Sequence, residues 1–353
     1  MKVALFCWRP YHVFNAINIV SNDVEHSKGN TTLFLFDYPV LVKMVEALTK
    51  SRLFEEVIVV KNNRESGDHA KKLLGQFKSK FSNYLTIEGE RRNFSNCFNT
   101  IMASSFNIDL IEMIDINKKA RICIYEDGVN SYSSDANFNH LNPKFRLLRK
   151  VLLKDLNKIK VDTKYFYSPE ILSYTSKSEC CALPVIKERT FEIEKSIFNY
   201  NSQKMLKLYG NKSIIFLDQR FQSDCYEKIE KLLRKRSERV ILRPHPNDPP
   251  SFDTFSLDDS EQSWELICND NISNSSVIIS VNSMALFTPY ILYHKKPTII
   301  ALYKLILNEK IYGIKNFDLF CQKFKQRSKY ENMFIPETLD EFGQILTNFD
   351  NIQ

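Results

Sequence analysis

Short apolar runs alternate along the chain with longer segments whose apolar residues recur at helical spacing. The runs are rich in Val, Ile, Leu and Phe, which is typical of strands buried in a parallel sheet. Segment 38–50 shows the helical pattern, with apolar side chains at Val40, Leu41, Met44 and Leu48. This alternation predicts a doubly wound α/β domain. In the first half, the expected strands are 3–7, 32–36, 57–60 and 120–125, and the expected helices are 11–20, 38–50, 68–81 and 107–119, with Pro10 where the first helix could begin.

The second half of the chain repeats the scheme. Its expected strands are 213–217, 239–242, 277–280 and 298–302, and its expected helices are 223–235 and 283–294. We therefore predict two Rossmann-like doubly wound domains that face each other across a cleft, an N-terminal domain over 1–175 and a C-terminal domain over 185–353. The link between them is expected within 163–187.

Composition and charge limit the class of protein and its partners. The 353 residues are 43% hydrophobic and 26% charged, which describes a globular chain. The net charge of +7 is spread along the sequence, so it favours an anionic partner such as a nucleotide, a membrane surface or an acidic glycan, and not a nucleic acid. No apolar run approaches the roughly 20 residues that span a bilayer, and the opening is too short for a signal peptide, so a cytoplasmic protein is expected.

Three short polar segments, 126–128, 243–246 and 280–283, each follow an expected strand directly. In open parallel sheets, ligands bind outside the carboxyl ends of the strands. These segments are therefore where the sequence predicts chemistry.

The segment 126–128 places two carboxylates, Glu126 and Asp127, before Gly128. Adjacent carboxylates that are both buried repel each other, so one of them can titrate high and act as a general base. The alternative is a solvated strand-to-loop turn, for which Asp-Gly is common. Asp224 is a second acidic candidate, because it stands at the start of an expected helix, as a cap or as a side chain that faces the cleft.

The segment 243–246 holds His245 between Pro244 and Pro246, directly after Arg243. The prolines keep the backbone extended and rigid, so the imidazole is preorganised to pair with a phosphate or to give it a proton. The alternative is a histidine that only caps a loop. The other histidines are interpreted as structural or surface groups, with His12 a partial exception because it lies just past the first strand.

The segment 280–283 ends in Asn282 and Ser283, just before an expected helix. Free backbone N–H groups at a helix N-terminus suit a phosphate. An ordinary N-cap also needs a serine or an asparagine, so both interpretations stand.

Other nucleotide and metal signatures are lacking in the sequence. The eight scattered glycines form neither a P-loop nor a GxGxxG motif, no Asp-x-Asp pair stands at a convincing strand end, and the eight cysteines form no CxxC pair. We therefore expect no metal and no bound cofactor.

Segment 144–160 is amphipathic and strongly basic. Its apolar positions follow helical spacing, and its polar positions carry seven lysines and arginines against Asp155 alone. Such a helix can lie on an anionic membrane surface, or it can pack on the protein with a solvated basic face.

Taken in order, 126–128 (EDG), 245–246 (HP) and 282–283 (NS) resemble the acidic-glycine, HP and serine-pair motifs of bacterial sialyltransferases. The opening 6–12 (FCWRPYH) looks like the start of glycosyltransferase family 52, the lipooligosaccharide and capsule sialyltransferases, which share these motifs with bacterial polysialyltransferases. The resemblance covers roughly residues 1–305 and departs where an asparagine replaces the first serine of the pair.

The resemblance implies a GT-B fold and an inverting, metal-independent transfer of sialic acid from CMP-sialic acid to a galactose-type acceptor of a capsule or lipooligosaccharide. It places His245 on the departing CMP phosphate, with Ser283 and Asn282 on the same phosphate and Arg243 and Pro246 beside them.

The same resemblance leaves the base open. The acidic-glycine motif points to Asp127 or Glu126, whereas relatives with the base at the first helix of the second domain point to Asp224. Glu265 resembles a ribose-binding glutamate and is expected to contact the donor.

Three alternatives stay open from the sequence: a GT-B enzyme with a different nucleotide sugar, a sugar-nucleotide epimerase of the same shape, and a non-enzymatic membrane-surface scaffold that uses 144–160. The protein is expected in the cytoplasm, at the inner face of the bacterial membrane if 144–160 binds lipid. The sequence leaves open whether it forms a homodimer.

Overall fold

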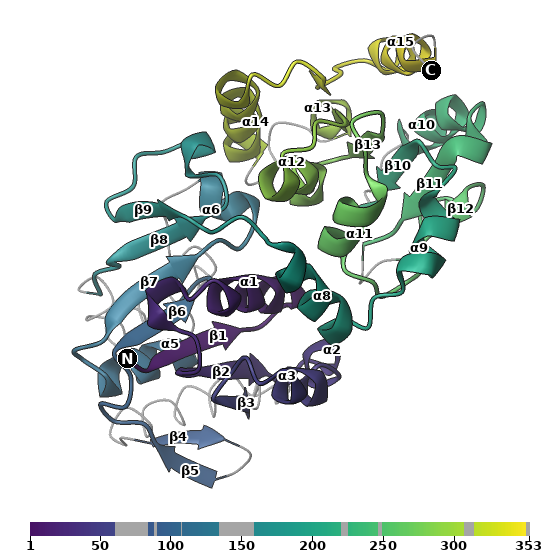
Figure 1. Ribbon diagram of the computed structural model, residues 1–353. Coiled ribbons are helices and arrows are strands. Elements are labelled where there is room, and N and C mark those ends of the chain that lie inside the picture. The colour runs from purple at the N-terminus through teal and green to yellow at the C-terminus, as the bar shows by residue number, and fades with distance from the viewer. Residues whose placement is uncertain are drawn as a thin grey trace, which may run out of the picture. The chain divides into compact units, whose positions relative to one another are not determined.

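The computed structural model describes residues 1–60, 84–87, 90–106, 108–133, 159–219, 225–245, 249–306 and 314–350. These residues form two compact units. Within the described ranges, the first unit holds 1–127, 159–169 and 175–198, and the second holds 128–133, 170–174 and the residues from 199 onward. Each unit is built on one parallel sheet with helices packed against it, which confirms the expected pair of Rossmann-like α/β domains (Figure 1).

Seven parallel strands form the sheet of the first unit, in the order β3-β2-β1-β6-β7-β8-β9. They are β1 (Val3–Cys7), β2 (Thr31–Phe36), β3 (Glu56–Val60), β6 (Thr100–Ala103), β7 (Arg121–Tyr125), β8 (Thr163–Phe166) and β9 (Glu179–Ala182). The chain first adds β2 and β3 on one side of β1 and then adds β6 to β9 on the other side. The strand order therefore reverses between β1 and β6, and residues that follow these two strands come together at this switch point.

Helices cover both faces of this sheet. They are α1 (Pro10–Ser21), η1 (Val24–His26), α2 (Pro39–Val42), α3 (Val45–Ser51), α5 (Ile108–Ile116) and α8 (Glu188–Ile197). Leu5 of β1 packs with residues of α1, α3 and α8, whereas Phe6 packs with residues of α5, because successive side chains of a strand point to opposite faces. A separate antiparallel hairpin joins β4 (Tyr84–Ile87) to β5 (Glu90–Asn93).

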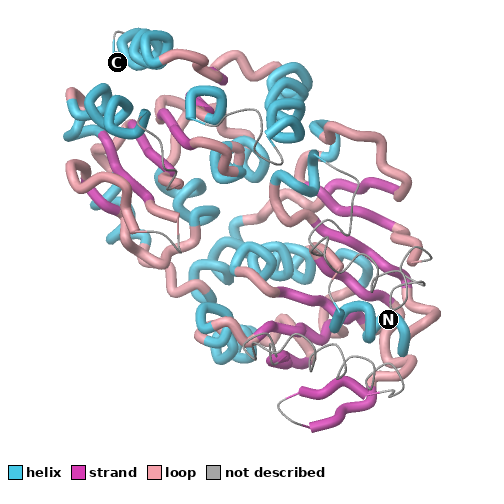
Figure 2. The backbone as a smooth tube through the Cα atoms, turned by 180° about the vertical axis from the view of Figure 1, so that it is seen from behind, coloured by secondary structure: helices cyan, strands magenta, loops and turns pink. Residues whose placement is uncertain are grey.

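Six parallel strands form the sheet of the second unit, in the order β12-β11-β10-β13-β14-β15. The order reverses between β10 and β13, so this unit has its own switch point. Figure 2 shows the strands of both units in magenta between cyan helices. The strands are β10 (Ile214–Leu217), β11 (Val240–Arg243), β12 (Ser256–Leu257), β13 (Val277–Ser280), β14 (Thr298–Ala301) and β15 (Met333–Phe334). The helices are α6 (Val129–Ser133), α9 (Ser202–Tyr209), α10 (Cys225–Arg234), η6 (Ser237–Arg239), α11 (Trp264–Asn271), η7 (Met284–Leu286), α12 (Thr288–Tyr293), α13 (Tyr303–Ile306), α14 (Ile314–Ser328) and α15 (Leu339–Asp350), and η5 (Pro169–Ile171) begins at the boundary of the two units.

The structure differs from the sequence prediction at the expected link. Segment 163–187 holds β8 and β9, so the first unit continues to Phe198. The aromatic residues that suggested a link, such as Tyr165 and Phe166, are buried strand residues. The single helix expected over 38–50 is divided into α2 and α3, and β6 has no counterpart among the predicted strands.

Two predicted segments cannot be followed in the structure. The helix expected over 68–81 lies outside the described residues, and so does the basic segment 144–160 except for its last two residues. Among the described residues, no helix is both long enough and apolar enough to cross a membrane.

Candidate active site

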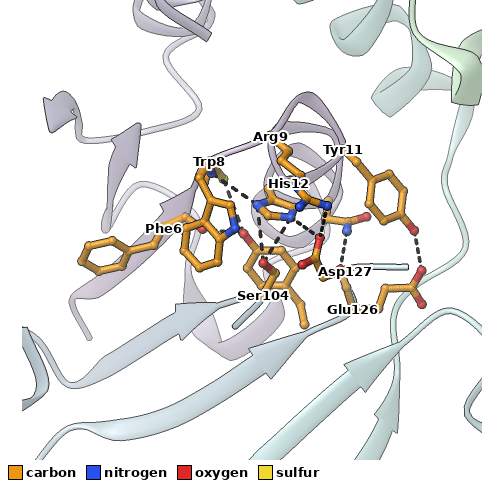
Figure 3. A network of polar contacts seen from close by, with 11 residues as sticks. Phe6, Trp8, Arg9, Tyr11, His12, Ser104, Glu126 and Asp127 are labelled. Carbon is orange, nitrogen blue, oxygen red and sulfur yellow. Dashed lines mark hydrogen bonds and ion pairs between the residues drawn. The ribbon is translucent and has the colours of Figure 1, made fainter. Parts of the chain in front are cut away.

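Polar residues gather at the carboxyl ends of β1, β6 and β7, next to the switch point of the first sheet. The helix α1 begins directly after β1, because Pro10 occupies its first turn, where the missing N–H needs no partner. This short connection brings His12 to the end of the sheet, where Ser104 follows β6 and Asp127 follows β7. Figure 3 shows these three side chains pointing toward one another.

His12 is fully buried, and its ring is held at both nitrogens. The backbone N–H of Trp8 donates to His12 Nδ1 at 3.2 Å. Nδ1 is therefore an acceptor, which leaves the proton of a neutral imidazole on Nε2. Nε2 lies 2.6 Å from Asp127 Oδ1 and 3.1 Å from Ser104 Oγ. The imidazole thus donates a hydrogen bond to the Asp127 carboxylate.

The two carboxylates of the acidic-glycine motif have different surroundings. Glu126 is 1% exposed, and its carboxylate accepts from the Tyr11 hydroxyl and, at 2.9 Å, from the Tyr167 N–H. The side chain of Asp127 is 15% exposed, and Arg9 Nη1 lies 3.7 Å from its Oδ1. Asp127 is therefore the carboxylate that a substrate can reach, whereas Glu126 anchors the end of β7.

Gly128 completes the motif at the point where the chain passes from the first unit to the second. Its φ is +92°, a backbone conformation that residues with a side chain rarely adopt. A Cβ atom there would meet Met284 Cγ only at an ordinary contact distance of 3.7 Å. The backbone turn, and not a lack of space, therefore requires glycine.

A second polar cluster lies at the switch point of the second sheet, between β10 and β13. Gln219, two residues after β10, accepts through Oε1 from the Asn282 N–H at 2.9 Å, and this oxygen is 3.2 Å from the Ser280 hydroxyl. The backbone N–H of Asn282 is thus used within the protein. Gln219 holds the turn that leads to Ser283.

Ser283 acts as an N-cap, because its Oγ accepts from the Ala285 N–H at 3.2 Å. The helix that follows is not the continuous one expected over 283–294. It is a short 3-10 turn, η7, followed by α12, since Pro289 in the first turn of α12 cannot continue a preceding helix.

His245 comes two residues after β11 and is exposed. Leu217 of β10 pairs with Arg243 of β11 and with Ser280 of β13. The segments that carry His245 and Ser283 therefore follow neighbours of β10 at the same edge of the sheet. Two predicted site residues, Pro246 and Asp224, lie outside the described residues.

Arg243 contacts other protein groups in place of the phosphate contact that was expected for it. Its guanidinium forms an ion pair with the buried Asp258 and donates to the Gln262 carbonyl oxygen at 2.5 Å. Burial raises the pKa of the Asp258 carboxyl, but the Arg243 charge and the hydrogen bonds that this carboxylate accepts hold its pKa below the ordinary value. Arg243 therefore stabilises the loop after β12 from inside the protein.

The start of α11 packs against Arg243. The Trp264 ring centroid lies 5.8 Å from Arg243 Cζ, within the range of a cation–π contact. Ser263 is the N-cap of α11, and its hydroxyl donates to Glu265 Oε2 at 2.6 Å. The Glu265 side chain is partly buried in the first turn of this helix. The contact with the donor that the motifs imply for Glu265 stays a prediction.

His12, Ser104 and Gln219 are the site residues that the sequence prediction did not include. His12 carried a signal, since it follows the first strand at the start of a helix that opens with Pro10. Its partnership with Ser104 depends on β6, which was not among the predicted strands. Gln219 carried no signal in the sequence beyond its position after β10.

Comparison with known proteins decides the family. A family model described as Alpha-2,8-polysialyltransferase (POLYST) matches residues 5–302, a range that includes both polar clusters. The chain belongs to the alpha-2,8-polysialyltransferase family. It is therefore a glycosyltransferase and a sialyltransferase, as the motifs implied, and the scaffold and epimerase alternatives no longer stand. No curated protein matches this sialyltransferase at a significant level.

Solved structures with little sequence identity share its fold. An alpha/beta-galactoside alpha-2,3-sialyltransferase from the luminous marine bacterium Photobacterium phosphoreum matches with a TM-score of 0.52 at 12% identity, over 95% of this chain and 98% of that chain. Arabidopsis thaliana UGT89C1 complexed with UDP-L-rhamnose matches with a TM-score of 0.51 at 11% identity, over 99% of this chain and 97% of that chain. At these identities the likeness concerns the fold alone, and it confirms the expected GT-B class.

Proposed function

We propose that this sialyltransferase moves sialic acid from CMP-sialic acid to the end of a bacterial capsule or lipooligosaccharide glycan, with inversion at the anomeric carbon and without a metal. The observation that carries the proposal is the partly exposed Asp127 carboxylate, held by His12 next to the switch point of the first sheet. A fixed carboxylate at the edge where parallel sheets bind ligands suits proton transfer from an acceptor hydroxyl.

The proposed reaction is a single displacement. The acceptor hydroxyl oxygen bonds to the anomeric carbon as the bond from that carbon to the CMP phosphate oxygen breaks. Asp127 takes the hydroxyl proton, and the electron pair of the broken bond leaves with CMP. Attack opposite to the leaving group inverts the anomeric carbon, through a transition state with oxocarbenium character.

The departing phosphate is proposed to be stabilised by His245 and Ser283. An imidazolium and a hydroxyl that are already oriented can offset the negative charge that grows on CMP. Gln219 supports them by fixing the turn before Ser283. In the part of the chain that the structure describes, no group of three or more histidine, cysteine or acidic side chains is arranged to hold a metal ion.

Replacing His245 with alanine is expected to lower kcat for CMP release by about 10²-fold, because one stabilising donor is removed from the leaving group. His245 is exposed, so the melting temperature should not change. CMP release from CMP-sialic acid is measured in the presence of acceptor, with His26→Asn as a matched change at another exposed histidine. Full turnover by the His245→Ala enzyme would refute this role, and turnover of another nucleotide sugar in place of CMP-sialic acid would refute the proposed donor.

The acceptor is proposed to end in sialic acid, because the family name describes alpha-2,8 transfer and Arg9 lies near the base. Arg9 is 65% exposed and 3.7 Å from Asp127, so it can pair with the carboxylate of an acceptor sialic acid. The galactose-type acceptor suggested by the motifs offers no such charge and is the competing proposal.

Changing Arg9 to glutamine should raise the KM of an acceptor that ends in sialic acid by about tenfold, since a charge-assisted hydrogen bond is lost. The KM of a neutral, galactose-ended acceptor should stay the same. Initial rates with both acceptors measure this difference. An equal effect on both, or activity with galactose alone, would rule out the acceptor proposed here.

Cellular location and assembly rest on the sequence. We propose that the basic segment 144–160 holds the enzyme at the cytoplasmic face of the membrane. Binding of the full chain to vesicles with and without anionic lipid, before and after neutralising the lysines of this segment, decides the question. Homodimer formation stays open to measurement by light scattering.

A further inference from the structure

His12 belongs to a line of buried polar residues on a helix that otherwise packs in the core. His12, Asn15 and Asn18 are each fully buried, and their spacing of three places them on neighbouring turns along α1. Buried polar groups are costly unless they are hydrogen-bonded. The Asn18 side chain donates a hydrogen bond to the carbonyl oxygen of Pro184, and so ties α1 to the backbone after β9. His12 instead contacts the proposed base.

The His12 ring is oriented by a backbone contact in addition to its contact with Asp127. His12 is the third residue of α1, and its Nδ1 accepts from the N–H of Trp8, which precedes the N-cap residue Arg9. This contact works like a capping box, in which a side chain of the first turn reaches back to a backbone N–H before the helix. The helix start thus fixes the tautomer, with the proton on Nε2.

The fixed ring restrains the Asp127 side chain. Nε2 lies 2.6 Å from Asp127 Oδ1, and Ser104 Oγ, 3.1 Å from Nε2, packs beside this contact. Asp127 is the second residue after β7, and of its printed contacts the one with His12 is shorter than the 3.7 Å to Arg9 Nη1. A misplacement of about 1 Å at a reacting group can cost about 10² in rate. The imidazole therefore controls a distance on which the proposed proton transfer depends.

We propose that His12 is a positioning residue, which holds Asp127 for proton transfer and does not take the proton itself. This inference rests on the proposed role of Asp127 as the base. Because Nδ1 accepts from Trp8, a proton arriving on the ring would break the contact that orients it.

Two substitutions separate the contact with Asp127 from the contact with Trp8. His12→Gln places an amide nitrogen near the former Nε2 and keeps a donor toward Asp127. His12→Asn places an oxygen near the former Nδ1, keeps an acceptor for Trp8 and is too short to reach Asp127. We expect His12→Asn to lower kcat for sialyl transfer by about 10²-fold, with KM for CMP-sialic acid unchanged, and His12→Gln to stay within about tenfold of the wild type.

A double substitution adds a readout that a purely structural role would not move. In an Asp127→Asn background, His12→Asn should lower kcat no further, because the group that it positions is gone. Equal losses in His12→Asn and His12→Gln, full activity in both, or an additional loss in the double variant would each overturn the proposal.

A measurement without turnover keeps this test separate from the identity of the donor. Nitrogen NMR of the full-length enzyme should find His12 with a proton on Nε2 and none on Nδ1, and the Nε2 resonance should shift in the Asp127→Asn variant. A proton on Nδ1, or a resonance that ignores Asp127, would overturn the proposal. If the wild type does not use CMP-sialic acid, the proposed function fails while this result still stands.

Discussion

Replacing Asp127 with asparagine is expected to lower kcat for sialyl transfer by about 10³-fold, because a general base contributes roughly 10²–10⁴ to such a step. The change keeps the size of the side chain and removes its ability to take a proton. Donor binding should persist, since Asp127 belongs to the first unit and the proposed phosphate contacts belong to the second. Initial rates of transfer and calorimetric titration with CMP-sialic acid measure the two effects separately.

Glu126 supplies the matched control for this prediction. Glu126→Gln should leave kcat within about tenfold of the wild type but lower the melting temperature. Both carboxylate oxygens of Glu126 accept hydrogen bonds, and a glutamine has only one oxygen, so its NH2 group would face either the Tyr11 hydroxyl or the Tyr167 N–H, which are both donors. Asp224→Asn belongs in the same series, since the motifs allow this residue as the base. Near-full turnover by Asp127→Asn together with a large loss in Asp224→Asn would reverse the assignment.

Replacing Arg243 with methionine is expected to lower the free energy of unfolding by about 3–5 kcal/mol, the usual cost of removing one partner of a buried ion pair. The side chain of Asp258 is completely buried, so without Arg243 its charge has lost its nearest cation. Denaturant unfolding of both proteins measures the difference. Arg234→Met is a matched control, because Arg234 pairs with Glu230 at the surface, where ion pairs contribute little.

The same ion pair predicts how stability depends on pH. The pKa of Asp258 is lower in the folded protein than its ordinary value of 3.8, so the unfolded chain binds the proton more readily. The contribution of this carboxylate is therefore fully present above about pH 4 and is lost as the pH falls through the folded pKa. The Arg243→Met protein should lose this acid-dependent part of its stability. Equal stability of the two proteins at neutral pH would contradict the structural role of Arg243.

Much of the fold and part of the site could be predicted from local patterns. The strand expected over 277–280 is β13 with the same bounds, because four consecutive apolar or small residues between polar turns are sufficient to identify a buried strand. The helix α1 begins at Pro10 as expected, since proline favours the first turn. Strand ends also identified the three polar segments, including Asp127 and His245.

The sequence by itself determined the alternation of strands and helices, the two-domain α/β class and the segments in which chemistry is placed, because these depend on neighbours a few residues apart. Only the tertiary structure decided which side chains meet. His12 and Asp127 are 115 residues apart and come together because β1 and β7 belong to one parallel sheet, separated only by β6, so that the segments after their carboxyl ends lie at the same edge.

The roles of Arg243 and Glu126 were decided in the same way. Arg243 is turned inward by Asp258, and Glu126 is occupied by Tyr11 and Tyr167, which leaves Asp127 as the accessible carboxylate of its pair. Strand order and the direction of a side chain depend on packing between distant segments. The spacing of apolar residues along the sequence does not encode such packing.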